Sequence, residues 1–208
     1  MTTQVKYKLG EREANGLCRV IALVAFSDVA AGDVGGYVES ERNLAHAGDA
    51  WVSGDAWVSW NARVYGDAWV SGNAQVHGDA CVYGNARVYG DARVYGDARV
   101  SGDARVYGDA LVYGDAWVYG DALVYGDARV YGDAQVSTVC AVTPKVITGF
   151  RYPLAITDEH LRAGCQVHTF QEWRNKTERE VLAMDGKSAL VFYKKTLIPL
   201  MDVLKLGV

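Results

Sequence analysis

His77 is one residue of this sequence whose side chain could do chemistry. Histidine works as a general base near neutral pH when a second group orients its ring. It is the only histidine between Gly48 and Ser137, at a position that Tyr or Ser fills in neighbouring segments. We therefore interpret His77 as a surface variant of that position, and the sequence predicts no catalytic residue.

A second group of reactive side chains lies near the C-terminus. His160, Cys165 and His168 have the order H-x4-C-x2-H, which could ligate zinc if a fourth ligand joined them. The spacing fits no standard zinc finger. A structural interpretation fits better: Thr157 caps a short helix that Gly164 ends, and Cys165 is buried as a small hydrophobe. The sequence thus predicts neither a metal nor a cofactor.

Tryptophan, tyrosine and arginine recur at fixed positions from Trp51 to Tyr131. All three residue types are enriched at protein interfaces. They could also stack on single-stranded nucleic acid, but twelve Asp in the same stretch would repel phosphates. Those aspartates could instead mimic a nucleic-acid backbone, although six Arg neutralise half of their charge. We predict a protein-binding surface that contains Trp51, Trp57, Trp69, Arg87, Tyr89, Arg93, Tyr95, Arg105 and Tyr107.

A six-residue repeat must position these side chains. From Gly48 to Ser137 every sixth residue is Val (Val52 to Val136), and every sixth residue is Ala (Ala50 to Ala134). Asp or Asn precedes each Ala, and Gly precedes that residue except at Trp60. Ala and Val are two apart, so a strand points both to the same side. Gly followed by Asp or Asn is typical of a turn.

Each unit is therefore a short strand followed by a bend. Three bends close a triangular coil of eighteen residues, and the fifteen units predict a mainly β protein, a parallel β-helix of about five coils. Trp51 and Trp69 are eighteen apart and should stack on one face, with Trp57 on the adjoining face. We expect these Trp to lie in or beside an interface, unless the N-terminal segment folds over them.

The two ends differ from the repeat. Residues 1–47 form the expected N-terminal lead-in and capping segment, and residues 48–137 form the β-helix. Residues 138–208 should be a small α or α+β module. In this module Thr177 and Glu180 form a capping box that opens a short helix, which should stop near Asp185 and Gly186.

The unit V-x-G-[DN]-A-x resembles the hexapeptide repeat of left-handed parallel β-helices, best known from acyltransferases. Together with the segment Phe26 to His46, and a tail that includes Ile156 to His160, the chain is similar to phage and prophage hexapeptide-repeat proteins. The resemblance implies a left-handed coil and side-by-side trimers. It also implies an alternative function, an acyl-CoA-dependent acyltransferase, which would need a catalytic His and a protruding loop. The array from Gly48 to Ser137 contains no insertion.

Charge and hydropathy argue against nucleic-acid-binding, membrane and secreted proteins. The net charge of −4 does not suggest binding to nucleic acid or to an anionic membrane. No apolar run approaches the length of a membrane span, and the first residues lack the apolar stretch of a signal peptide. We expect a cytoplasmic, non-catalytic scaffold, in the host cytoplasm if phage-encoded. Its expected partner is a second copy, as a dimer or trimer, or a host protein in a host-directed or anti-defence role.

Overall fold

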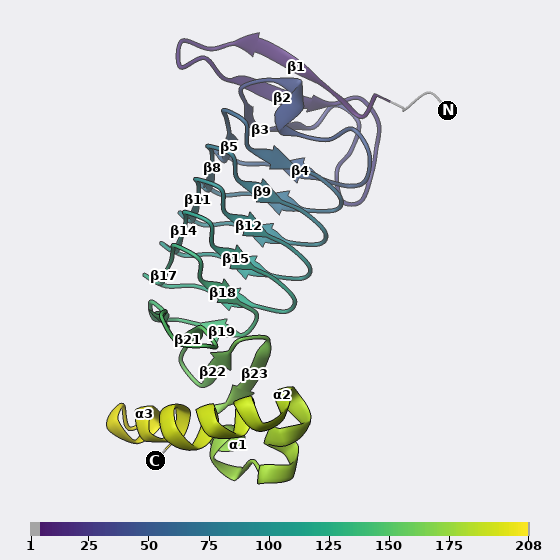
Figure 1. Ribbon diagram of the computed structural model, residues 1–208. Coiled ribbons are helices and arrows are strands. Elements are labelled where there is room, and N and C mark those ends of the chain that lie inside the picture. The colour runs from purple at the N-terminus through teal and green to yellow at the C-terminus, as the bar shows by residue number, and fades with distance from the viewer. Residues whose placement is uncertain (1–4, 208) are drawn as a thin grey trace. The chain divides into compact units, whose positions relative to one another are not determined.

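The six-residue repeats form short parallel strands that stack on three sides of a solenoid. The computed structural model describes residues 5–207, which divide after Pro144 into two compact units. In the first unit, strands eighteen residues apart pair in parallel, as β7 and β10 do through Trp69 and Arg87. The labels β5, β8, β11, β14 and β17 mark successive strands of one side (Figure 1). The mainly β fold and the parallel solenoid are thus confirmed.

Three sheets make up this unit. The eight-stranded sheet contains β1 (Tyr7–Arg12), β2 (Cys18–Ala22), β3 (Val34–Val38), β5 (Trp57–Val58), β8 (Gln75–Val76), β11 (Arg93–Val94), β14 (Leu111–Val112) and β17 (Arg129–Val130). The six-stranded sheet contains β4 (Trp51–Val52), β7 (Trp69–Val70), β10 (Arg87–Val88), β13 (Arg105–Val106), β16 (Leu123–Val124) and β19 (Val139–Cys140). The five-stranded sheet contains β6 (Arg63–Val64), β9 (Cys81–Val82), β12 (Arg99–Val100), β15 (Trp117–Val118) and β18 (Gln135–Val136).

The solenoid has about six turns rather than the five that the repeats predict. The additional sides come from residues outside the strict repeat. At the N-terminal end β3 pairs in parallel with β5, and Leu44 bridges to Val64. At the other end β19 pairs with β16 although it follows β18 at a shorter spacing. At both ends, parallel backbone pairing therefore extends at least one strand beyond the residues that follow the repeat.

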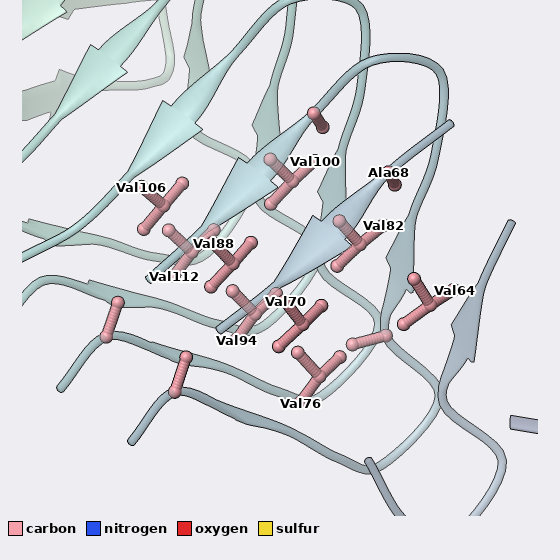
Figure 2. Packing of buried hydrophobic residues seen from close by; sticks show 14 of the residues in the cluster. Val64, Ala68, Val70, Val76, Val82, Val88, Val94, Val100, Val106 and Val112 are labelled. Carbon is pink, nitrogen blue, oxygen red and sulfur yellow. The ribbon is translucent and has the colours of Figure 1, made fainter. Parts of the chain in front are cut away.

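The core consists of the Val and Ala columns. Val52 to Val136 and Ala50 to Ala134 are at most 1% exposed, and Figure 2 shows the Val side chains directed into the centre. The corner glycines have φ values near +70°, and a Cβ at Gly90 would lie 3.0 Å from the backbone nitrogen of Gly108. Left-handed backbone and close approach both favour Gly at this position.

The N-terminal segment closes the first turn with side-chain donors. Within the array many backbone N–H groups donate to a carbonyl of the following turn, as Trp69 does to Ala86. Some carbonyls of the first turn accept from backbone N–H groups of the N-terminal segment, as Ala56 does from Tyr37, and at the corners side chains supply the donors. The Lys6 ammonium donates to the carbonyl oxygens of Gly48 and Ala50, at 2.9 and 2.7 Å.

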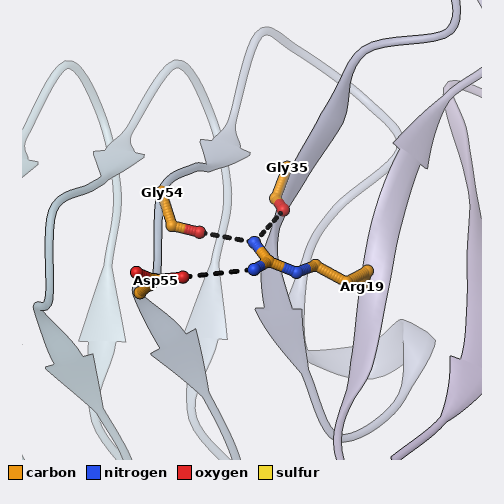
Figure 3. Close-up of polar contacts among 4 residues, drawn as sticks. All are labelled: Arg19, Gly35, Gly54 and Asp55. Atoms are coloured by element: carbon orange, nitrogen blue, oxygen red, sulfur yellow. Dashed lines mark hydrogen bonds and ion pairs between the residues drawn. The ribbon is translucent and has the colours of Figure 1, made fainter.

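The other two corners of this turn have their own donors. The Asn43 amide, on the short 3-10 helix η1 (Glu41–Asn43), donates to the carbonyls of Trp60 and Ala62, at 3.0 and 2.9 Å. The Arg19 guanidinium donates to the carbonyls of Gly35 and Gly54 and pairs with Asp55 (Figure 3). Three polar side chains thus replace backbone donors of an absent turn, which protects the exposed end of the solenoid.

The second unit is an α+β module. Its four-stranded antiparallel sheet consists of β20 (Lys145–Ile147), β21 (Leu154–Ile156), β22 (His160–Ala163) and β23 (Gln166–Thr169). Helices α1 (Phe170–Asn175) and α2 (Glu178–Phe192), the π-helix η2 (Tyr193–Leu197) and helix α3 (Ile198–Val203) follow. Leu161, Trp173, Leu197 and Met201 belong to its own buried core. No helix among residues 5–207 is long and apolar enough to cross a membrane.

Two expectations for this unit have different outcomes. Thr177 caps α2 with a complete capping box, and the helical geometry breaks at Asp185 and Gly186, as predicted. The helix predicted between Thr157 and Gly164 is wrong. These residues belong to the hairpins of β21, β22 and β23, where strand pairing provides the backbone hydrogen bonds and Gly164 supplies a turn with φ of +60°.

Candidate binding surfaces on the solenoid

Trp51 and Trp69 are neighbours in adjacent strands of one sheet, as predicted. The predicted exposure of Trp51 is wrong. The two residues pair in β4 and β7. Trp51 is only 3% exposed, because Phe26 packs edge-on against its ring at 5.4 Å and the N-terminal strands cover it. Trp69 is half-buried against the same core. Trp51 is therefore a core residue, and only Trp69 of this pair reaches the surface.

The outer surface of the six-stranded sheet carries a row of large side chains, which we call the β7–β16 face. It consists of Trp69, Arg87, Arg105 and Leu123, which are direct neighbours in successive strands. Arg87 and Arg105 are exposed, whereas Trp69 and Leu123 are half-buried. Two guanidinium groups thus stand one strand apart between two apolar side chains.

A ladder of tyrosines borders the β7–β16 face. The rings of Tyr89 and Tyr107 are parallel at 4.9 Å between centroids, and Tyr107 and Tyr125 follow at 5.3 Å. Partial burial, and then the neighbouring Tyr107, raise the pKa of Tyr89 above its ordinary value. Tyr89 therefore stays neutral at physiological pH, and the stacked rings form an aromatic edge.

The remaining predicted residues lie with the eight-stranded sheet. Trp57 is on β5 and Arg93 on β11, separated by Gln75. His77 is stacked between Trp57 and Tyr95, with centroids at 5.5 and 5.1 Å. Burial, and then the charge of Arg93, lower the pKa of His77. The nine predicted residues therefore do not form one surface, because they divide between two sheets and the core.

The predicted burial of Cys165 is wrong, because its side chain is exposed in the turn between β22 and β23. The two histidines of this unit also do not lie on one face. In the pairing of β22 with β23, His160 lies opposite Thr169, and Leu161 lies opposite His168. Opposed residues share a face of a sheet, so the two histidines project from opposite faces. Across residues 5–207, no group of three or more His, Cys, Asp or Glu side chains is arranged to hold a metal ion.

Sequence reasoning missed a hollow beside the first turns. It has a volume of about 930 Å³, and its lining includes Arg12, Tyr37, Glu39, Trp57 and Trp60. Trp60 is 68% exposed and has a φ of +60°. A bulky residue in this conformation is an outlier that costs about 1–3 kcal/mol. The signal was visible in the sequence, because Trp60 is the one break in the glycine column of the array.

Comparison with known proteins supports the repeat assignment. A family model described as the YdcK beta solenoid repeat matches residues 62–78, 80–94, 92–106, 104–120 and 122–138. No curated protein matches the chain. The matched segments lie inside the array and coincide with the strands β6 to β18. The middle of the chain is therefore a β-solenoid whose repeats are similar to those of the YdcK family.

Proposed function

We propose that the protein is a non-catalytic solenoid scaffold that binds another protein through the β7–β16 face. The observation that carries this proposal is the row Trp69, Arg87, Arg105 and Leu123 beside the Tyr89–Tyr107–Tyr125 ladder. Aromatic and arginine side chains dominate the binding energy of protein interfaces. Here a hydrogen-bonded sheet holds their backbones in register, so little backbone conformational entropy is lost on binding.

The charge of the face indicates the chemistry of the partner. Arg87 and Arg105 are exposed on neighbouring strands and present two guanidinium groups in a row. Arginine forms bidentate hydrogen bonds with carboxylates. We infer a partner surface in which acidic side chains meet the arginines and apolar side chains pack on Trp69 and the tyrosine rings.

The resemblance to phage and prophage proteins extends this proposal. It rests on the array together with the segment Phe26 to His46. A phage-type scaffold would bind a host protein or a second copy of itself, in a host-directed or anti-defence role. A dimer or trimer is the self-associated form that the resemblance implies.

A charge-reversal pair tests the proposal. In the variant Arg87→Glu/Arg105→Glu the face carries carboxylates where it had guanidinium groups. The control is Arg99→Glu/Arg63→Glu on the five-stranded sheet, where both arginines are also exposed. We expect the first variant to lose a stoichiometric complex recovered from bacterial host cells, or its own oligomer in sedimentation, while the control retains it. Equal behaviour of the two variants would refute binding through the β7–β16 face.

Binding of acetyl-CoA tests the alternative function, an acyl-CoA-dependent acyltransferase. His77 is stacked between the rings of Trp57 and Tyr95, and burial lowers its pKa. This placement fits a structural role in the stack of rings better than a role as a general base. We expect no shift of the melting temperature with acetyl-CoA. A shift that is lost in His77→Ala would support the enzyme instead.

A further inference from the structure

The hollow beside the first turns is separate from the β7–β16 face. Its walls come from the β1–β2 hairpin, through Arg12, and from the β3 and β5 strands, through Tyr37 and Trp57. Glu39 and Trp60 complete its rim. All of these residues belong to the first unit. With about 930 Å³, the hollow is within the size range of ligand sites.

Trp60 occupies this rim at a structural cost. Other corners of the array have Gly with φ between +59° and +74°, whereas Trp60 has a Cβ and a φ of +60°. Its backbone N–H donates to the Glu39 carboxylate at 2.6 Å, which holds the corner in place. Its indole is 68% exposed and contributes nothing to the core. Strain that persists at an exposed position indicates a functional role.

The polar groups of the hollow are balanced in charge. Asp55 pairs with Arg19 at 3.1 Å. Arg12 and Glu39 carry opposite charges, and the Arg12 guanidinium donates to the backbone carbonyl of Glu39 at 3.0 Å. Ser59 lines the hollow as well, is 5% exposed, and its hydroxyl is buried with no hydrogen-bond partner among the described residues. A strongly charged ligand would meet charges of both signs here and would gain little net attraction, whether it were a cation or an anion.

We propose that this hollow binds a neutral oligosaccharide. The flat indole of Trp60, with Trp57 and Tyr37, offers aromatic surface to the C–H faces of sugar rings. Glu39 accepts hydrogen bonds from sugar hydroxyls and Arg12 donates to them, so both remain hydrogen-bonded when water leaves. A purely apolar ligand would leave the remaining donors of Arg12 and the remaining acceptor sites of Glu39 without partners when water leaves. The proposal does not depend on the protein-binding role of the β7–β16 face.

The test uses the substitution Trp60→Gly, which restores the repeat. Because it removes the strained Cβ, we expect the variant to melt higher, by roughly 2–4 °C. The control is Trp117→Gln, another exposed Trp of the solenoid whose column contains Gln135. The probes are arrayed neutral oligomers of glucose, N-acetylglucosamine, galactose and mannose, with sulfated glycans, sialylated glycans and oligolysine peptides as alternatives.

We expect the wild type to bind at least one neutral oligomer and Trp117→Gln to bind it equally. Trp60→Gly should weaken this binding by about tenfold or more, which corresponds to about 1.4 kcal/mol, and Trp60→Tyr should retain part of it. Three results would overturn the proposal: no neutral oligomer bound, preference for a charged glycan or peptide, or unchanged affinity in Trp60→Gly. A melting temperature of Trp60→Gly at or above that of the wild type shows that lost binding does not reflect unfolding.

Discussion

The side-chain amide of Asn85 donates a hydrogen bond to the Asp103 carboxylate, 2.9 Å away in the next turn. The other two corners have the same arrangement, in the pairs Asn61–Asp79 and Asn73–Asp91. Each corner column contains one Asn, and the other positions are Asp stacked on Asp. Asn73 and Asn85 therefore each lie between two carboxylates of their column, whereas Asn61 begins its column and contacts one.

Asn85→Asp should destabilise the solenoid in a salt-dependent way. The substitution removes a donor and adds a carboxylate beside Asp67 and Asp103. Because these groups are exposed, we expect a loss below about 1 kcal/mol, measured as a lower urea midpoint at low ionic strength. The isosteric change Asp103→Asn should have the opposite sign. A loss that is independent of salt would contradict the electrostatic origin.

Gly90→Ala should destabilise the protein more than Gly132→Ala. Both glycines have a positive φ, which costs about 1–2 kcal/mol for a residue with a Cβ. A Cβ at Gly90 would lie 3.0 Å from the nitrogen of Gly108, whereas one at Gly132 has no atom within 4 Å. The difference between the two thermal unfolding midpoints measures the close contact of successive turns. Equal midpoints would show that conformation alone requires the glycine.

The solenoid could be predicted from the sequence because each repeat position has one physical role. Val94 is fully buried, Arg93 beside it is exposed, and Gly90 forms the corner, as alternation and turn chemistry require. The number of turns was underestimated because β3 and β19 pair through backbone groups, which impose no pattern on side chains.

The candidate sites were harder to predict. Period six places Trp51 on the outside of its strand, but it gives no information on what covers that face. Phe26 and the N-terminal strands, which lie outside the repeat, bury it. The helix expected after Thr157 was wrong for a similar reason, because the pairing of β21 with β22 outweighs a local capping signal.

Lys6→Met should destabilise the protein, and the loss should grow between pH 7 and pH 9.5. Lys6 is 4% exposed, and burial lowers its pKa to about 8. In the unfolded chain it keeps its proton up to about pH 10.4. The unfolded state therefore binds more protons between these values, so the wild type gains stability from Lys6 as the pH rises.

The variant lacks this gain, and it also leaves the carbonyls of Gly48 and Ala50 without their donor. We expect the difference in urea midpoint between wild type and variant to be positive at pH 7 and larger at pH 9.5. Lys8→Met, at an exposed position on β1 two residues further on, is the control for the loss of a lysine side chain. A difference that shrinks with pH would mean that the charged ammonium is the more stable form.

His77→Tyr should preserve stability at neutral pH and remove part of the sensitivity to acid. The new ring would join the stack of Tyr95 and Tyr113, whose centroids are 5.0 Å apart. In the wild type, burial and then the charge of Arg93 hold the pKa of His77 below its ordinary value of about 6.5. The unfolded chain therefore binds the proton more readily, and the stability that neutral His77 provides is lost as the pH falls below 6.5.

Urea midpoints at pH 7.5 and pH 5.0 measure this loss, which should be smaller in the variant. His168 also has a pKa lowered by burial, but it lies in the second unit and is unchanged in both proteins. If wild type and variant lose equal stability between the two pH values, His77 does not titrate within the aromatic ladder.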